Sequence, residues 1–115
     1  MIPNYLQDLF KAQSYDPNQF FLIAGPCVVE DEALVMEIGE KVSTICKNLG
    51  IPYVFKASYR KANRTSANSF TGIGDDTGME LIKKVGARFN VPTTSDIHAH
   101  EEAAIAAQFI DILQI

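Results

Sequence analysis

Residues 20–27 read Phe20-Phe21-Leu22-Ile23-Ala24-Gly25-Pro26-Cys27, a continuous apolar run closed by a Gly-Pro pair. A run that is apolar at every position, and not only at alternate ones, is typical of a strand buried on both faces, as in parallel sheets covered by helices. Gly and Pro mark its end because both favour turns. We therefore predict a buried strand at 20–24, with polar chemistry free to begin at Cys27.

On the carboxyl side of this strand the pattern changes to apolar residues three or four apart, which predicts a helix at 30–49 ended by Gly50. The strand and helix patterns then repeat along the chain. The predicted buried stripe of the first helix is Val35, Ile38, Val42, Ile45, Cys46 and Leu49. Further strands are predicted at 53–57, 91–95 and 110–115, after a short amphipathic opening from Asn4. A second helix is predicted at 75–89, capped by Asp75 or Asp76, and an alanine-rich helix at 101–109. The predicted inward residues of the second helix are Met79, Ile82, Val85 and Phe89.

Alternating apolar strands and helices with short connections indicate an α/β fold with a parallel sheet. Four strands and three helices fit an open doubly wound sheet, or about half of a (β/α)₈ TIM barrel, which typically needs about 250 residues. An apolar last strand at 110–115 would leave an unpaired edge if nothing covered it. We therefore expect residues 1–115 to be the amino-terminal portion of a single TIM-barrel domain.

Composition narrows the functional classes. The chain has 115 residues, 47% apolar content and a net charge of −4, and no segment approaches the roughly 20 apolar residues of a membrane span. The acidic balance argues against nucleic acid as a partner, and the beginning of the chain lacks the pattern of a signal peptide. We expect a cytoplasmic protein that contacts neither nucleic acid nor membrane, with both cysteines as free thiols.

A local positive stretch interrupts this acidic chain. No acidic residue lies between Glu40 and Asp75, and four of the ten cationic side chains fall within the nine residues 56–64. Asn, Ser and Thr lie among the cations and offer short hydrogen-bonding groups suited to phosphate and sugar oxygens. The stretch predicts a site for small phosphorylated anions, although a solvated loop whose charges face water is the simpler alternative.

Polar residues follow each predicted strand, where the loops of a parallel α/β fold converge on one mouth. They are Cys27 after the first strand, Lys56 and Ser58 after the second, Asp96 and His98 after the third, and Gln114 on the fourth. Each has a simpler reading: Cys27 as a small apolar residue, Asp96 as a helix cap, His98 in a surface or capping role, and Gln114 as part of a barrel layer. For Cys46, beside the apolar stripe, burial is the favoured reading.

Taken together, these motifs resemble those of 3-deoxy-D-manno-octulosonate 8-phosphate synthases, and the resemblance covers nearly all of the chain from Phe20 onward. The matching segments are A-G-P-C-V-V-E at 24–30, G-I-P-Y-V-F-K-A-S at 50–58, K-A-N-R-T-S at 61–66, T-S-D-I-H at 94–98 and L-Q-I at 113–115. The family is a (β/α)₈ barrel, and the similarity corresponds to its amino-terminal part.

The resemblance implies a transferase of lipopolysaccharide biosynthesis that condenses phosphoenolpyruvate with D-arabinose 5-phosphate and releases phosphate. It assigns Lys61 to phosphoenolpyruvate, with Lys56 as a second cation and proton-transfer group. It places Ser58 among the substrate-binding residues, together with Asp96 and Gln114 near the sugar and His98 in the same motif. The remaining contacts to arabinose 5-phosphate are Asn63, Arg64 and Ser66.

The resemblance also separates two subclasses. Family members with cysteine at the position of Cys27 require a divalent metal ion, whereas members with asparagine do not, so Cys27 implies a metal-dependent enzyme. A homotetramer is implied because the basic loop of this family reaches across a subunit interface. Two departures stand out: Arg60 replaces a frequent aspartate and makes the stretch more positive, and Ala99 replaces a frequent glutamate.

Two alternatives stay open from the residues. The first is 3-deoxy-D-arabino-heptulosonate 7-phosphate synthase, which uses erythrose 4-phosphate and shares the A-G-P-C opening. Its loop usually reads K-P-R-T-S, whereas the extra amide of Asn63 suits a sugar with one more hydroxyl. The second is a non-catalytic, flavodoxin-like module whose basic loop docks an anionic partner.

Overall fold

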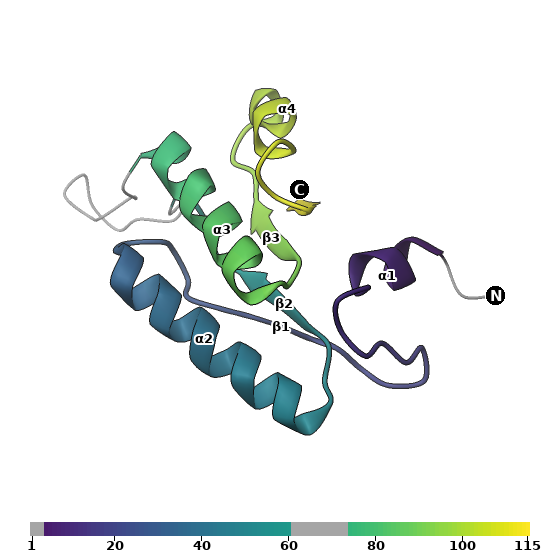
Figure 1. Cartoon of the computed structure of the whole chain (residues 1–115). Coiled ribbons are helices and arrows are strands. Elements are labelled where there is room, and N and C mark those ends of the chain that lie inside the picture. Colours follow the sequence, from purple (N-terminus) through teal and green to yellow (C-terminus); the bar gives the residue numbers. More distant parts are fainter. Residues whose placement is uncertain (1–3, 61–73) are drawn as a thin grey trace.

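The computed structural model describes residues 4–60 and 74–115 (Figure 1). Helices and strands alternate after a short opening helix, as the sequence predicted. In chain order the elements are α1 (Asn4–Leu9), β1 (Leu22–Ala24), α2 (Glu32–Leu49), β2 (Tyr53–Lys56), α3 (Asp75–Phe89), β3 (Thr93–Asp96), the 3₁₀ helix η1 (His100–Glu102), α4 (Ala103–Ala106) and β4 (Ile112–Gln114).

The four strands form one parallel sheet in the order β1-β2-β3-β4. Each strand therefore pairs with the next one in the sequence, so right-handed crossovers place the connecting helices on the same face. Accordingly, α2 and α3 pack side by side (Figure 1). A doubly wound sheet would instead reverse its strand order and carry helices on both faces. The described strands thus have the arrangement of consecutive β/α units of a TIM barrel, and the predicted α/β class is confirmed.

Capping residues set the ends of α2 close to the predicted positions. The Asp31 side chain accepts a hydrogen bond from the Ala33 N–H at 2.9 Å, so the helix begins at Glu32 and not at Glu30. Gly50 ends it in the left-handed conformation, with φ of 69°, and its N–H bonds to the carbonyls of the last turn. The predicted stop at Gly50 is confirmed.

The caps of α3 differ from the prediction at one end. Gly74 is the N-cap, without a side-chain hydrogen bond, while Asp75 and Asp76 lie in the first turn, where their charges favour the positive end of the helix dipole. The expected aspartate cap is therefore wrong. Asn90 ends the helix with φ of 59°, a conformation that asparagine tolerates better than most residues.

The core lies between the sheet and the two long helices. The predicted inward residues of α3 are confirmed, with Met79, Ile82 and Val85 fully buried and Phe89 packed against the same cluster. In α2 the predicted stripe was too wide, because Ile45 and Leu49 are 56% and 67% exposed. The buried face of α2 is centred on Val35, Gly39 and Cys46. Ile45 lies outside that face, and Leu49 lies in the last turn.

All four strands are shorter than predicted, most clearly β1 and β4, and so is the alanine-rich helix. β4 covers only Ile112–Gln114 of the predicted 110–115. β1 covers only Leu22–Ala24, and Phe20 before it is 69% exposed. The alanine-rich segment forms η1 and the single turn α4 in place of a continuous helix over 101–109. Because alanine side chains have little apolar area to bury, tertiary packing stabilises a longer helix in this segment only slightly.

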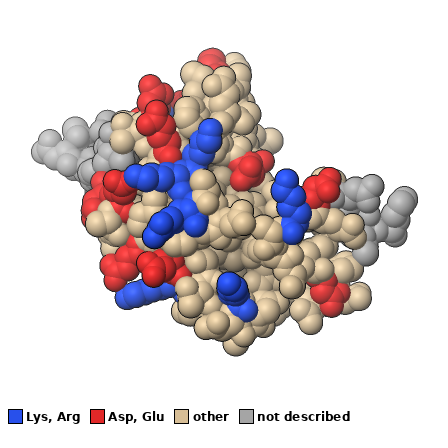
Figure 2. Space-filling view, viewed as in Figure 1, with Lys and Arg blue, Asp and Glu red and all other residues tan. Residues whose placement is uncertain are grey.

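Charged side chains are intermixed on the face shown in Figure 2. Lys84 of α3 pairs with Glu32 of α2, and Lys41 pairs with Glu37 within α2 at 3.0 Å. These pairs are exposed, so each contributes little to stability.

Among the described helices, none combines the length and apolar content needed to cross a membrane.

Candidate functional site

A pocket of about 420 Å³ lies at the carboxyl ends of the strands. Five of the side chains predicted from the sequence line it: Cys27, Lys56, Ser58, Asp96 and Gln114. The rest of its wall consists of Ile23, Ala24, Gly25 and Pro26. The structure thus brings together residues that are up to 87 positions apart in the sequence, counted from Cys27 to Gln114.

The alternation of side chains along a strand explains this convergence. In β2, Tyr53 and Phe55 are buried in the core beside the helices, whereas Lys56 and then Ser58 line the pocket. Neighbouring residues on a strand point to opposite faces, so every second residue reaches the face without helices. Asp96 and Gln114 are register partners in β3 and β4, which places them next to each other on that face.

Hydrogen bonds fix the ends of three strand segments relative to one another. The Ser58 hydroxyl donates to Asp96 Oδ1, joining the end of β2 to the end of β3. The Ser58 N–H donates to the Cys27 carbonyl at 3.1 Å, and the Val29 N–H donates back to the Ser58 carbonyl at 3.0 Å. Asp96 therefore has a side-chain partner in the pocket. The alternative that it caps the following helix is wrong, since Ala99 is the N-cap there and makes no side-chain bond.

Gly25 allows β1 to approach β2 closely at this point. A Cβ atom at Gly25 would lie 1.8 Å from the Lys56 carbonyl oxygen, so only glycine fits. The sequence suggested that Gly25 and Pro26 simply ended a strand. The structure adds that the glycine brings the backbone leading to Cys27 against the strand that carries Lys56.

His98 is more buried than expected. Its side chain is 7% exposed, and its Nε2 atom lies 3.8 Å from Asp96 Oδ2 without a hydrogen-bond partner among the described residues. The ring also meets the Tyr59 ring edge-on, with 5.0 Å between centroids. A surface role for His98 is therefore wrong, whereas the side chain of His100 is 93% exposed.

The other predicted residues fall into two groups. Lys61, Asn63, Arg64 and Ser66 lie outside the described residues. Cys27 is exposed, and within residues 4–60 and 74–115 no three His, Cys, Asp or Glu side chains are grouped so that they could hold a metal ion. Cys27 and Asp96 nevertheless offer a thiol and a carboxylate to the same pocket, which is part of a donor set for a divalent ion.

A second cluster, which the sequence did not reveal, lies behind the pocket. Glu102 of η1 accepts hydrogen bonds from the Tyr59 hydroxyl and from Arg60 Nη2, the latter at 2.6 Å. Arg60 Nε also lies 3.7 Å from Asp75 Oδ1. The positive charge that Arg60 was expected to add is thus matched by two carboxylates. Glu102 was missed because nothing local marks a contact with residues 42 and 43 positions away.

The pKa values of this cluster reflect the contacts. Burial raises the pKa of the Tyr59 hydroxyl, and its hydrogen bond to Glu102 raises it further. Burial alone would raise the pKa of Glu102, but the hydrogen bonds from Tyr59 and Arg60 outweigh it, so the pKa is lowered. Burial likewise opposes the charge on Arg60, yet Glu102 and Asp75 leave its pKa raised. The cluster therefore holds Glu102 and Arg60 in their charged forms.

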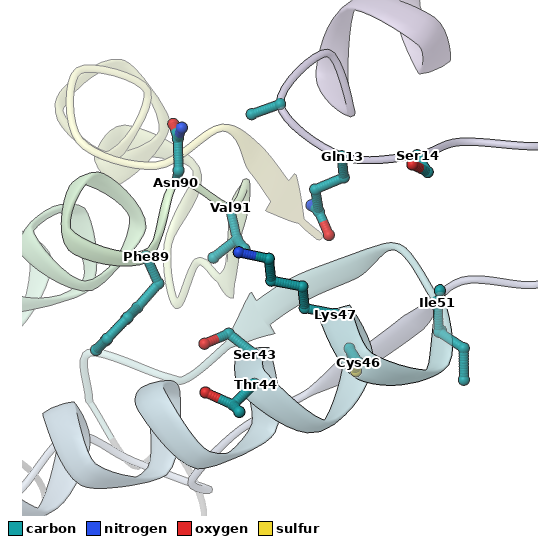
Figure 3. Close-up of a pocket in the computed structure, with 12 residues that line it drawn as sticks. Gln13, Ser14, Ser43, Thr44, Cys46, Lys47, Ile51, Phe89, Asn90 and Val91 are labelled. Carbon is teal, nitrogen blue, oxygen red and sulfur yellow. The ribbon is translucent and has the colours of Figure 1, made fainter.

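A larger pocket, of about 450 Å³, lies at the opposite ends of β2 and β3 (Figure 3). It is bordered by the last turns of α2 and α3 and by the segment around Gln13. Lys47 is the only cationic side chain among its lining residues, and the amino ends of the strands in such folds serve stability more than chemistry. Cys46 borders it as a buried thiol whose pKa burial raises, as expected of a core cysteine.

Comparisons with known proteins agree with the geometry. Three relatives are called 2-dehydro-3-deoxyphosphooctonate aldolase. The one from Koribacter versatilis is 50% identical over 97 residues, and its match covers 84% of this chain and 35% of that protein. The proteins from Trichlorobacter lovleyi and Francisella tularensis subsp. holarctica are 51% and 45% identical, covering 82% and 84% of this chain and 35% of each relative.

The chain thus spans about a third of the length of the curated relatives it matches. The predicted resemblance to 3-deoxy-D-manno-octulosonate 8-phosphate synthases is confirmed, because these similar proteins carry the name of that enzyme. The family model of the DAHP synthetase I family matches residues 11–115, which is almost the whole sequence. The chain belongs to the DAHP synthetase I family.

Proposed function

We propose that this chain supplies part of the active site of a 3-deoxy-D-manno-octulosonate 8-phosphate synthase. The observation that carries the proposal is the convergence of Cys27, Lys56, Ser58, Asp96 and Gln114 on one pocket at the carboxyl ends of parallel strands. The names of the relatives support the same reaction. The substrates are phosphoenolpyruvate and D-arabinose 5-phosphate.

In the proposed reaction, the enol carbon of phosphoenolpyruvate attacks the aldehyde carbon of the sugar and forms the new carbon–carbon bond. Water adds to the cationic carbon that results, and the tetrahedral intermediate expels inorganic phosphate by carbon–oxygen cleavage. One water is consumed, and its two protons leave the added oxygen and neutralise the alkoxide and the departing phosphate. Such a reaction depends on orientation and on fixed charges that face the developing ones.

The described residues are suited to parts of this task. Lys56 is an exposed cation that lines the pocket and can hold an anionic substrate or donate a proton. Asp96, fixed by Ser58, presents a carboxylate to sugar hydroxyls, and Gln114 presents an amide beside it. Lys61 is proposed to bind phosphoenolpyruvate, and Asn63, Arg64 and Ser66 the phosphorylated sugar. His98 would orient Asp96 across their 3.8 Å separation.

We also propose that Cys27 is a ligand of a divalent metal ion. Its thiol is exposed and shares the pocket with Asp96, so an ion there would reach the substrates. Such an ion supplies Lewis-acid polarisation of the aldehyde oxygen. Since the described residues do not complete a ligand set, further ligands would come from other residues. We propose a homotetramer from the resemblance alone, and a cytoplasmic location from the composition of the sequence.

An assay of the native protein with both substrates tests the reaction. We expect phosphate release that requires phosphoenolpyruvate and is faster with arabinose 5-phosphate than with erythrose 4-phosphate. Faster turnover of erythrose 4-phosphate would favour the heptulosonate synthase, and no turnover of either sugar would refute both. The Lys56→Gln variant should lower kcat/KM by about 100-fold, whereas Lys11→Gln, which removes an exposed cation outside the pocket, should leave it unchanged.

Metal binding is tested separately by mass spectrometry of the native protein. Wild-type protein should retain a stoichiometric divalent ion that a chelator removes, and Cys27→Ala should retain none. Cys46→Ala is the matched control, because the thiol of Cys46 is buried away from this pocket. Equal metal content in Cys27→Ala and wild-type protein would exclude Cys27 as a ligand.

A further inference from the structure

Glu102 binds two consecutive residues, Tyr59 and Arg60, in the segment that directly follows β2, and it uses both carboxylate oxygens to do so. Oε1 accepts the hydrogen bond from the Tyr59 hydroxyl, and Oε2 accepts the one from Arg60 Nη2. Charge-assisted hydrogen bonds of this kind are stronger than neutral ones and restrict orientation. The side chains of Glu102 and Arg60 are 22% and 38% exposed, so these bonds are partly shielded from water.

Further contacts hold the same two residues in place. Tyr59 is completely buried, and its Cβ lies 3.0 Å from the position that a Cβ atom at Gly78 would take, so α3 packs tightly against it. Arg60 Nε lies 3.7 Å from Asp75 in the first turn of α3. Glu102 of η1 and Asp75 and Gly78 of α3 thus hold Tyr59 and Arg60 from the helix side of the sheet, and we call this set of contacts the clamp.

The clamp is directly continuous with the pocket. Ser58, the residue before Tyr59, donates its hydroxyl hydrogen bond to Asp96 on the other side of the sheet. The Tyr59 ring meets His98 edge-on. The backbone at Ser58 is therefore fixed by Asp96 on the pocket side and by Glu102, through Tyr59 and Arg60, on the helix side.

We propose that Glu102 is a positioning residue of the candidate site, which holds Tyr59 and Arg60 so that Ser58 and Asp96 keep the geometry that the reaction needs. This role rests on the proposed function and adds to it a residue outside the pocket. Glu102 touches no pocket-lining side chain in the described contacts, so it acts only through its two partners. The neighbouring Glu101 differs, because its side chain is 70% exposed and, among residues 4–60 and 74–115, its ion pair is with the exposed His100.

Kinetics of the native protein, measured well below the melting temperature, test the proposal. Glu102→Gln should lower kcat/KM by about 10-fold to 100-fold, because small displacements of reacting groups have effects of that size. The loss should appear mainly in kcat, and Glu102→Asp should recover part of it. Glu101→Gln, the matched control on the same turn, should behave as wild type.

Tyr59→Phe provides a milder variant that keeps the ring and removes only the hydroxyl. Its loss of kcat/KM should be smaller, and in the double variant with Glu102→Gln it should add little to the loss from Glu102→Gln alone, since the Tyr59 hydroxyl acts through its contact with Glu102. Independent, additive losses would overturn the proposal. So would a Glu102→Gln variant with a lowered melting temperature but unchanged kcat and KM, which would indicate a purely structural ion pair.

Amide hydrogen exchange separates failure of this proposal from failure of the proposed function. Glu102→Gln should speed exchange at the amides of Ser58 and Val29, which hydrogen-bond across the end of β2, and leave the amide of Ile82 in α3 unchanged. If wild-type protein does not consume the two substrates, the proposed reaction fails, but this exchange pattern would still support the clamp. Unchanged exchange at Ser58 and Val29 would overturn it whatever the activity.

Discussion

The side-chain amide of Gln13 forms two hydrogen bonds with the backbone of Tyr53, which is 40 residues away. Nε2 donates to the Tyr53 carbonyl at 2.9 Å, and Oε1 accepts from the Tyr53 N–H at 2.8 Å. Gln13 thus satisfies both backbone groups of the first residue of β2. The Tyr53 hydroxyl in turn donates to the Ala24 carbonyl of β1 at 2.8 Å. The segment before β1 is therefore attached to the start of the sheet by polar contacts.

Replacing Gln13 tests that attachment. Gln13→Ala should lower the free energy of unfolding by about 1–3 kcal/mol, because it leaves a buried donor and a buried acceptor without partners. Gln13→Glu should also destabilise the protein at neutral pH, since a carboxylate cannot donate to the Tyr53 carbonyl. Chemical denaturation measures both effects. Gln7→Ala on the exposed side of α1 is the control, and an equal effect of the two alanine variants would contradict the assigned role.

Gly25 provides a test of close packing beside the pocket. Gly25→Ala would place Cβ 1.8 Å from the Lys56 carbonyl oxygen, so β1 and β2 would have to move apart. We expect a loss of more than about 2 kcal/mol in unfolding free energy, since backbone atoms cannot rotate away as a side chain can. Gly50→Asn is the matched control, because Gly50 has open space around it and Asn90 adopts the same left-handed conformation in α3. Unfolding free energies that fall equally in the two variants would exclude the clash as the cause.

Much of the fold and the five functional side chains that line the described pocket could be predicted from local sequence patterns. Apolar runs gave the strand positions, and the rule that chemistry gathers at the carboxyl ends of parallel strands selected the pocket residues from Cys27 to Gln114. Spacing alone overestimated the buried stripe of α2, because it does not say how far α3 and the sheet extend along the helix. Ile45 and Leu49 were assigned to the core for that reason.

Long-range contacts had no local signature. Glu102 looks like one more charged residue at the start of an alanine-rich segment, and its function as a partner of Tyr59 and Arg60 depends on how η1 folds back over the end of β2. Arg60 was expected to add positive charge for the same reason, because its partners Glu102 and Asp75 are distant in the sequence. Sequence patterns report which face a residue occupies, but not which charged partner it meets there.

The two cysteines should differ in reactivity toward alkylating reagents. Cys27 is exposed, whereas Cys46 is 2% exposed and burial raises its pKa, so little reactive thiolate forms there. Mass spectrometry after brief treatment of native, chelator-stripped protein with iodoacetamide should find label on Cys27 and almost none on Cys46. Labelling of both sites should follow in denaturant. Prompt native labelling of Cys46 would show that the core between α2 and β2 opens readily.

Glu102 should make stability depend on pH in the acid range. Its pKa in the folded protein lies below its ordinary value of 4.5, because Tyr59 and Arg60 hydrogen-bond to the carboxylate more than burial disfavours it. A lowered pKa means that the charged group stabilises the folded state at pH values above 4.5, and that this contribution is lost as the pH falls through the folded value. The effect should therefore be absent at the most acidic pH.

The Glu102→Gln variant isolates this contribution, because glutamine cannot be protonated or deprotonated in this range. The difference in unfolding free energy between wild-type protein and the variant should be largest near about pH 6 and should shrink as the pH is lowered toward about 3. Urea denaturation at a series of pH values measures it, with Glu101→Gln as the control, whose difference from wild type should stay small throughout. If the wild-type and Glu102→Gln curves run parallel over the whole range, the carboxylate of Glu102 is not stabilised by Tyr59 and Arg60, and the clamp that they form with it loses its electrostatic basis.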